Sequence, residues 1–335
     1  MVVRVKLPKR QRRRKNIKLC LRILSLSCVL LGGSLFFWEE GVKRVDYPKP
    51  VTTTNIQVYD TERQILMSMD LEEYLIGVVA AEMPASFQLA ALQAQAVAAR
   101  TFAMSRIANP SAKVQAFHPE AQITTSPEIC QAWISEEEQK RRWGNNYAMY
   151  RQKITEAVQS TCGQVLTWQG ELAEPLYHAS CGGGNTEAAV NVWGNHVPYL
   201  VSVACNHPQD KHSQAETVFT LQEFSQKLQL EDEAMVGNFG DFIAVLSRTA
   251  AERVEKIRVG SRIMTGGQLR SLLGLKSSQF TYQIEGNSII FHTNGYGHGV
   301  GMCQHGADYY AEQGYAYQQI LAYYYPGTAI LSLPI

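Results

Sequence analysis

The first 22 residues of this chain contain no acidic residue, although they hold ten lysines and arginines. Acidic residues outnumber basic residues in the rest of the chain. Residues 23–335 contain 21 lysines and arginines and all 30 acidic residues, which gives them a net charge of −9. A negatively charged body argues against nucleic acid as a partner. The basic run Lys9–Lys15 precedes an apolar stretch, so membrane topology explains it better than nucleic-acid binding.

Charged residues are also missing from Ile23 to Trp38. This stretch predicts a membrane anchor, residues 23–38, with the basic tail, residues 1–22, in the cytoplasm. It is shorter than the roughly 20 residues of a full span, but Leu19, Leu21 and a snorkelling Arg22 extend it. A cleaved signal peptide is the alternative, yet no A-x-A-like site follows the stretch. We therefore expect a single-pass protein of the cytoplasmic membrane whose remaining residues are extracytoplasmic.

No internal repeat or low-complexity tract stands out in the rest of the chain, which is long enough to form one large unit or two intimately packed units. Two prolines and three threonines in Tyr47–Thr54 indicate a linker. We expect residues 39–54 to link the anchor to one domain over residues 55–330.

Helical and strand patterns are mixed along this domain. Apolar spacing predicts helices at Asp70–Met83 and Gln88–Ala108, followed by a less regular stretch to Asn146. A further helix opens at Thr220 with a capping-box pattern. Strands are expected at these segments: Ile56–Tyr59, Ile65–Met69, Gly163–Trp168, Leu176–His178, Thr217–Phe219, Arg253–Val259, Thr281–Glu285 and Ser288–His292. The mixture predicts an α+β fold.

The Gly-rich run Gly295–Gly301 lacks the marks of a phosphate-binding loop, since no Lys-Ser or Lys-Thr pair follows it and no βαβ unit surrounds it. We expect its glycines instead to let the backbone approach an extended substrate. His298, Gln304 and His305 would project beside that substrate, at the start of a helix from Met302 to Gly314.

The segment Asp70–Pro84 places one carboxylate, Glu82, at the end of an apolar helical stripe. Pro84 ends the helix, so Glu82 falls in the last turn, where the helix dipole is negative and no backbone N–H is free to help ionise it. Burial and dipole both raise its pKa. The stripe has i, i+3, i+4, i+7 and i+8 spacing: Leu71, Tyr74, Leu75, Val78 and Val79. An active-site cleft at this helix end is one interpretation; a polar helix end that faces water or pairs with Arg100 is the other.

Arg100 lies on the packed face of the second helix, together with Leu89, Leu92 and Ala96. A buried arginine requires an anion. We expect Arg100 to support Glu82 or to position substrate.

The run LEEYLIGVVAAEMPASFQLAALQAQAVAARTFA, Leu71–Ala103, resembles the signature of the stage II sporulation protein D family, which includes the amidase-enhancer (LytB-type) proteins. Three later stretches agree with it in the expected order: Tyr177–Val203, Gly267–Phe280 and Gly295–Gly327. The resemblance extends from Asn55 to Thr328. One departure is Cys181, which stands where the family commonly has a serine or threonine run before its glycines.

The resemblance implies a lytic transglycosylase that cuts the β-1,4 bond between N-acetylmuramic acid and N-acetylglucosamine in peptidoglycan. Glu82 matches the family's catalytic acid. A neutral carboxylic acid can protonate the leaving oxygen, after which the muramic acid's own C6 hydroxyl attacks to give a 1,6-anhydro product. No second carboxylate is needed, in contrast to a hydrolase. The implied partners are peptide-stripped glycan strands and a peptidoglycan amidase. Further substrate-binding candidates are Arg100, Tyr177, Ser180, His298, Gln304 and His305.

No metal or other cofactor is expected. Some family members bind zinc through a His-x5-Cys-x4-His-Cys pattern, whose positions here are His118, Thr124, Ile129 and Cys130. Two of the four ligands are therefore lost, and the other two cannot close a tetrahedral site. Distant residues such as Cys162, Cys181, Cys205 or His207 could complete it, but no spacing requires this. Five cysteines follow the anchor, and their disulfide pairing stays open.

Two other classes of function remain open. A non-catalytic glycan-binding module that enhances an amidase would retain its function after Glu82→Gln. A thiol-dependent peptide hydrolase would use His178 with Cys181 or His298 with Cys303, although no signature of a known thiol hydrolase surrounds either pair.

Overall fold

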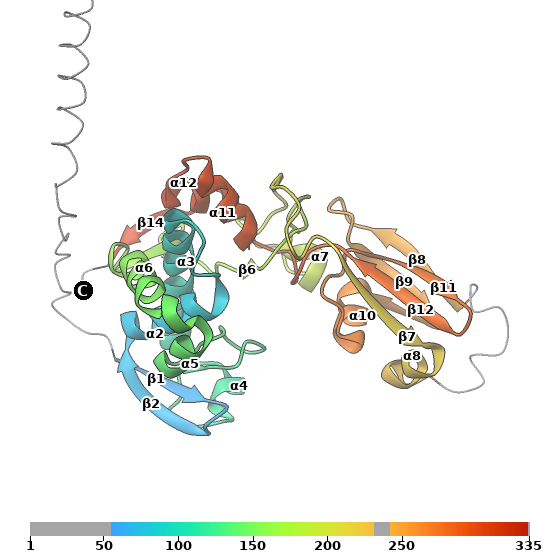
Figure 1. The fold of residues 1–335 in the computed structure, drawn as a ribbon, viewed down its shortest axis with the longest axis horizontal. Helices are drawn as coiled ribbons and strands as arrows, with labels where there is room; N and C mark the ends of the chain where they lie inside the picture. Colours follow the sequence, from blue (N-terminus) through green and yellow to red (C-terminus); the bar gives the residue numbers. More distant parts are fainter. Residues whose placement is uncertain (1–54, 231–241, 334–335) are drawn as a thin grey trace, which may run out of the picture. The chain divides into compact units, whose positions relative to one another are not determined.

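The computed structural model describes residues 55–230 and 242–333 (Figure 1). The predicted tail, anchor and linker, residues 1–54, lie outside the described residues. The chain divides into two units, residues 1–48 and 49–335, and all described residues belong to the second. Within the described ranges, no helix is both long and apolar enough to cross a membrane.

The described chain begins with a β-hairpin that leads directly into a helix. Strands β1 (Asn55–Asp60) and β2 (Ile65–Asp70) pair antiparallel with Asn55 opposite Asp70, and β3 (Ile123–Thr124) joins β1 in parallel. Both predicted strands are confirmed.

Helix α2 (Leu71–Glu82) follows β2 without a loop, because Asp70 both ends the strand and caps the helix. Its side chain accepts hydrogen bonds from the backbone N–H groups of Glu72 and Glu73, as expected of an N-cap. The predicted apolar stripe from Leu71 to Val79 is buried. The helix ends at Glu82 because Met83, before Pro84, is extended.

Helix α3 (Leu89–Ala108) is the central element of the first hydrophobic core. Its alanines are buried on several faces, so α2, α6 (Tyr147–Gln159), α11 (Gln304–Glu312), α12 (Tyr317–Tyr324) and β4 (Gln164–Trp168) all pack against it. Small side chains allow these close approaches. The sheet β14-β4-β5 adds β14 (Ala329–Ser332) and β5 (Glu171–Leu172).

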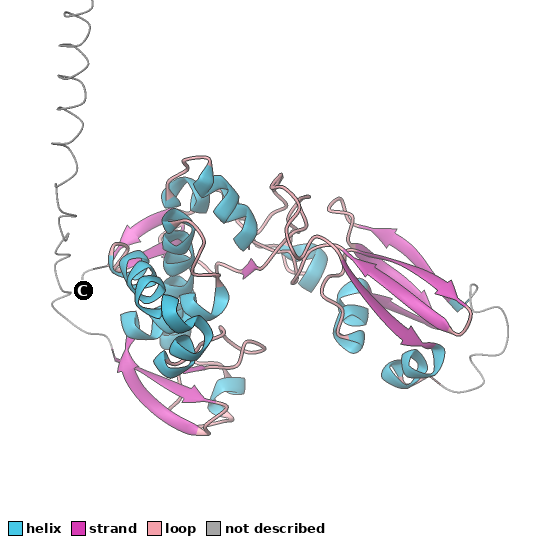
Figure 2. Ribbon diagram, in the orientation of Figure 1, coloured by secondary structure: helices cyan, strands magenta, loops and turns pink. Residues whose placement is uncertain are grey.

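A second hydrophobic core is built around two three-stranded antiparallel sheets, drawn as magenta arrows in Figure 2. One has the order β11-β12-β7 and the other β10-β9-β8. Phe224, Phe280 and Phe291 are buried here, with helices α8 (Leu221–Leu228) and α10 (Gly266–Leu273) against the strands. The strands are β7 (Ala215–Thr220), β8 (Ile243–Arg248), β9 (Val254–Val259), β10 (Arg262–Thr265), β11 (Phe280–Glu285) and β12 (Ser288–Thr293).

Short elements connect these parts. Strand β6 (Tyr177–His178) pairs in parallel with β13 (Met302–Cys303), which leads into α11. The remaining helices are α4 (Ala112–Gln115), α5 (Glu136–Trp143), the 3-10 helix η1 (Gly144–Asn146) and α7 (Ala189–Trp193).

The predicted α+β class is confirmed, but the stretch before Asn146 is more regular than expected. It contains α4 and α5, and the second of these has almost no apolar face because charged residues dominate it. An apolar-periodicity test cannot detect such a helix. Other features of the sequence do indicate this helix: an N-cap at Ser135, three glutamates in the first turn and basic residues in the last turn.

Candidate active site

Glu82 occupies the last position of α2 and is half-buried. Its Oε1 atom accepts a hydrogen bond of 2.8 Å from the backbone N–H of Ala132. The expectation that no backbone N–H reaches this carboxyl is therefore wrong. The α2 helix itself supplies none, but a loop 50 residues further along the chain does.

The loop can lie against α2 because Gly77 has no side chain. A Cβ atom there would lie 2.1 Å from Trp133 Nε1, so only glycine lets the indole ring rest on the helix. The next residue, Ile134, donates its N–H to the Gly77 carbonyl at 3.3 Å. These two contacts fix the segment that presents the Ala132 N–H to Glu82.

The pKa of Glu82 is raised, chiefly because burial disfavours the charged form. Hydrogen bonds from the Ala132 N–H and the Gln304 side chain act in the opposite direction. Tyr74 and Tyr177 are near enough for the Glu82 charge to raise their pKa values further, beyond the main effect of burial. The protonated form of the carboxyl is thus favoured, and two hydrogen-bond donors remain in place to stabilise the ionised form.

Glu82 lines a cavity of about 390 Å³. Its walls come from the end of α2, the start of α11 and the loops before β7 and after β6. Lys211, Arg142, His212 and His305 bring basic groups to it, while Phe87, Trp143 and Tyr296 supply aromatic surface. Among the described residues that line this cavity, Glu82 is the one carboxylic acid.

Two predicted site residues, Gln304 and His305, share this cavity with Glu82. They are the first two residues of α11, and the backbone N–H of His305 bonds the Ala179 carbonyl at 3.1 Å. The Gln304 amide donates to Gln95 Oε1 on α3 at 3.3 Å, which holds the buried side chain in place. The start of α11 is therefore well placed to orient Glu82.

Ser180 lies behind the cavity wall and is fully buried. Its hydroxyl donates to Asp210 Oδ2 at 2.6 Å. The same carboxylate oxygen lies 3.9 Å from His305 Nδ1, and Asp210 Oδ1 accepts from the His212 backbone N–H. Asp210 thus connects Ser180 to the cavity; sequence analysis missed it, because an aspartate in a polar loop carries no distinctive local signal.

Tyr177 is also close to Glu82 but points its hydroxyl elsewhere. The hydroxyl donates to Gln131 Oε1 at 2.9 Å, and the Gln131 amide in turn donates to the Ala99 carbonyl at 3.3 Å. Tyr177 therefore braces the loop that carries Ala132.

Arg100 is not brought to Glu82. It is buried and forms a two-point ion pair with Glu72, with Nη2 2.6 Å from Oε2 and Nε 2.8 Å from Oε1. Its remaining donors bond Thr161 and the carbonyls of Val158 and Gln164. The anion that a buried arginine requires is present, but it is Glu72, so this place gives Arg100 a structural role.

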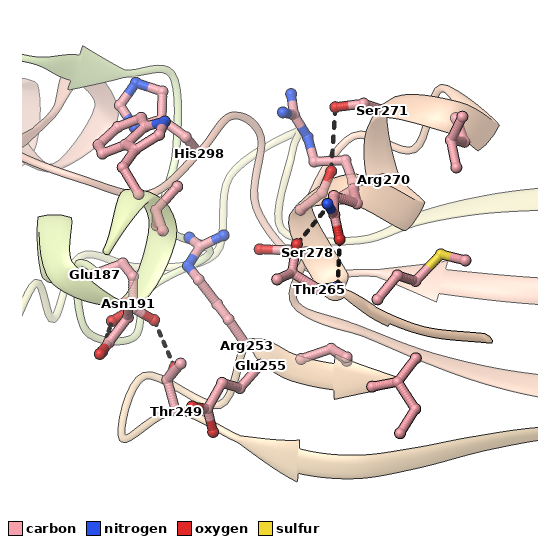
Figure 3. Close-up of a pocket in the computed structure, with 18 of the residues that line it drawn as sticks. Glu187, Asn191, Thr249, Arg253, Glu255, Thr265, Arg270, Ser271, Ser278 and His298 are labelled. Atoms are coloured by element: carbon pink, nitrogen blue, oxygen red, sulfur yellow. Dashed lines mark hydrogen bonds between the residues drawn. The ribbon is translucent and has the colours of Figure 1, made fainter. Parts of the chain in front are cut away.

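His298 lines a different cavity, of about 890 Å³, shared with Arg253, Arg270 and Glu187 (Figure 3). Its ring lies 5.3 Å from the Trp193 ring and 5.9 Å from the His178 ring. Burial, aided by nearby positive charge, lowers the pKa of His298 to about 3. The structure thus separates His298 from Gln304 and His305, which the sequence had grouped together.

The glycines before α11 do not open space for a substrate, contrary to expectation. Gly297 and Gly301 pack against the chain's own β6 segment instead. A Cβ at Gly301 would lie 1.9 Å from the Leu176 carbonyl oxygen, and one at Gly297 would lie 2.9 Å from the Cβ of His178. Both glycines have positive φ, +71° and +107°.

The candidate thiol Cys181 is close enough to act on the pKa values of both His178 and His207, where burial lowers the pKa and Cys181 raises it, so the predicted His178–Cys181 pair is not separated. Cys181 lies 3.4 Å from the ring of His207, and all five described cysteines are free. His118 stacks on Tyr59, and its Nδ1 accepts from the Glu120 N–H. Thr124 and Ile129 provide no zinc ligand at two of the four positions of the family zinc pattern. Across residues 55–230 and 242–333, one group of metal-binding side chains converges, around Cys181.

A model of the stage II sporulation protein family matches residues 47–168, a range that includes Glu82, Gly77 and Ala132. Stage II sporulation protein D of Bacillus subtilis is 39% identical over 281 residues, covering 82% of this chain and 78% of the relative. The chain belongs to the stage II sporulation protein D family. The Bacillus amyloliquefaciens member of the family is 37% identical over 282 residues, with the same two coverages.

A more distant relative has another name. The amidase enhancer of Bacillus subtilis is 28% identical over 313 residues, covering 77% of this chain and 40% of the relative. The two names agree with the two halves of the predicted family, sporulation protein D and amidase enhancer.

Proposed function

We propose that this chain is a peptidoglycan lytic transglycosylase with Glu82 as its general acid and base. The observation that carries the proposal is a half-buried carboxyl with a raised pKa in a cavity where, among the described lining residues, it is the one acid. A hydrolase normally uses two carboxyl groups, whereas intramolecular attack needs one.

Glu82 first donates its proton to the glycosidic oxygen between N-acetylmuramic acid and N-acetylglucosamine, and the bond to the muramic C1 breaks. The C6 hydroxyl of the same muramic residue then attacks C1, and the Glu82 carboxylate accepts its proton. The product has a 1,6-anhydro end, and Glu82 is again protonated. Effective molarity favours this intramolecular attack over attack by water.

The neighbours of Glu82 support both halves of this cycle. Burial raises the pKa of the carboxyl and so favours its protonated form before cleavage. The Ala132 N–H and the Gln304 side chain stabilise the carboxylate that forms when the proton leaves.

Basic groups at the cavity favour glycan stripped of its stem peptides. Muramic acid without a stem peptide exposes its lactyl carboxylate, and Lys211 and Arg142 line the cavity. Arg142 also pairs with Glu138 at 2.6 Å, which leaves Lys211 as the better candidate partner. A peptidoglycan amidase that produces such glycan is the partner we propose, and a single-pass anchor at residues 23–38 would place the domain that follows it outside the cytoplasmic membrane.

The experiment digests intact and amidase-stripped peptidoglycan with the full chain and analyses the products by mass spectrometry. Glu82→Gln is compared with Glu128→Gln, an exposed glutamate outside the cavity. We expect 1,6-anhydro ends from wild type and Glu128→Gln but not from Glu82→Gln. Reducing ends would instead indicate a hydrolase, and new amino termini a peptide hydrolase.

The second candidate is a non-catalytic glycan-binding enhancer of an amidase, which the name of the amidase-enhancer relative favours. It predicts that Glu82→Gln leaves both glycan binding and enhancement intact. No cleavage by wild type, together with retained glycan pull-down and faster amidase turnover, would favour this candidate.

A further inference from the structure

Four metal-ligating side chains from three distant parts of the chain converge at one buried point. They are Cys181 after β6, Cys205 and His207 in the loop before β7, and Cys303 in β13. Their ligand atoms all lie within 4.8 Å of one another, and all four residues are buried. Three thiols and an imidazole are a ligand set that zinc accepts in closed sites.

The distances match a single tetrahedral ion. His207 Nε2 lies 3.4 Å from Cys181 Sγ and 3.5 Å from Cys303 Sγ. With zinc–sulfur bonds of about 2.3 Å and a zinc–nitrogen bond of about 2.0 Å, tetrahedral geometry separates nitrogen from each sulfur by about 3.5 Å. One imidazole nitrogen can form a hydrogen bond to one thiol, but a shared ion explains two equal contacts.

The His207 ring is oriented for this role by its other nitrogen. Nδ1 lies 2.7 Å from the Pro208 carbonyl, which accepts only if Nδ1 carries the proton. Asp210 Oδ2 lies 3.7 Å from the same nitrogen. The tautomer that results leaves the Nε2 lone pair facing the thiols, as in metal-bound histidines.

Two of the three sulfur atoms, those of Cys303 and Cys205, have hydrogen-bond donors beside them, as thiolate ligands require. Cys303 Sγ accepts the backbone N–H groups of Cys181 and Gly306, each at 3.3 Å, and it caps the N-terminus of α11. Cys205 Sγ lies 2.9 Å from the Tyr324 hydroxyl. A Cβ at Gly306 would lie 2.4 Å from Cys205 Sγ, so a glycine is required for α11 to approach this closely.

A disulfide explains the cluster less well. Any pair formed among the three cysteines leaves the third thiol and the imidazole buried without a comparable partner. A bound ion uses all four groups together.

We propose that Cys181, Cys205, His207 and Cys303 bind one zinc ion in a closed structural site. All four coordination positions come from the protein, so no water position remains for catalysis. This site is separate from the family pattern at His118 and Cys130.

The site is directly adjacent in sequence to the cavity that holds Glu82. Cys181 follows Ser180, and Cys303 precedes Gln304 and His305. His207 lies three residues before Asp210, the carboxylate bonded to Ser180. The ion would therefore hold in place the segments that build the cavity wall opposite α2. This placement makes the metal a support for catalysis and not a reactant.

The test measures metal content in the full chain, purified without a polyhistidine tag. We expect one zinc per chain by elemental analysis, and three thiols that resist alkylation until zinc is displaced. Cobalt substitution should give the visible spectrum of a tetrahedral cobalt–thiolate site.

Cys303→Ser tests the ligand assignment, with Cys130→Ser and Cys162→Ser as matched controls outside the cluster. We expect zinc to be lost from the first variant and retained by the two controls. If Cys303→Ser does not fold, zinc content measured in His207→Ala and in wild type still tests the ligand assignment. Wild type without zinc, iron in place of zinc, or a mass lacking two hydrogens because a disulfide has formed would each overturn the proposal.

Discussion

The backbone N–H of Ala132 donates a hydrogen bond of 2.8 Å to Oε1 of Glu82, across 50 residues of sequence. The donor stabilises the ionised carboxylate, while burial stabilises the neutral acid, and burial is the larger effect. A group that acts first as acid and then as base must be able to adopt both its protonated and its ionised form. The hydrogen bond from Ala132 makes the rise in the Glu82 pKa smaller without cancelling it.

Cleavage should fall as pH rises through the raised pKa of Glu82, because the acid must be protonated to start the reaction. The measurement is kcat/KM for glycan cleavage from acidic to alkaline pH. Gln304→Met removes a side chain that lowers this pKa. Its alkaline limb should therefore move to higher pH, and an unchanged limb would contradict the role of Gln304.

The same pKa shift makes fold stability depend on pH. A carboxyl whose pKa is higher in the folded state stabilises the fold fully below its unfolded pKa, and this contribution is lost as pH rises through the folded pKa. The loss is about 1.4 kcal/mol per unit of pKa difference. Glu82→Gln should thus gain stability relative to wild type as pH rises, measured by denaturant unfolding, whereas Glu128→Gln should show no such trend.

Gly77→Ala should disrupt the active site by displacing the loop that packs on α2. The new Cβ would meet the Trp133 ring at 2.1 Å, which must displace the loop that carries Ala132. We expect a stability loss of roughly 1–3 kcal/mol from overpacking, and a lower kcat. Gly267→Ala is the control, since its Cβ would meet nothing closer than Thr265 Oγ1 at 3.7 Å. Unchanged stability and kcat for Gly77→Ala would show that the loop can relax without moving Ala132.

Arg100→Met should cost stability and leave the chemistry of the folded molecules intact. The substitution leaves the Glu72 carboxylate largely buried without its ion-pair partner, which should lower the free energy of unfolding by about 3–5 kcal/mol. Adding Glu72→Met removes the stranded charge and should recover most of that loss. The readouts are unfolding free energy and KM per folded molecule. A raised KM with normal stability would return Arg100 to the substrate site.

His298 should matter less for cleavage than His305, although both were expected at the substrate. Its pKa of about 3 keeps it neutral at physiological pH, and it lines the cavity without Glu82. We expect His298→Asn to change kcat/KM less than His305→Asn, assayed on amidase-stripped glycan. A larger loss for His298→Asn, with normal stability, would extend the substrate site into the second cavity.

The local part of this design could be predicted from the sequence. The apolar stripe of α2, its Asp70 cap and its termination before Pro84 depend on neighbouring residues, and they place Glu82 correctly at the end of a packed helix. The strands of the first hairpin follow equally from short-range alternation. Patterns within one element suffice because backbone geometry and side-chain periodicity are local properties.

The partners of these residues were decided by tertiary structure alone. Arg100 was expected to be buried with an anion, yet nothing local distinguishes Glu72 from Glu82 as that anion. The N–H of Ala132 reaches Glu82 only because Gly77 admits Trp133. The Cys181 cluster combines side chains as much as 122 residues apart. Such contacts depend on how whole elements pack, and no spacing in the chain encodes which distant donor arrives at which acceptor.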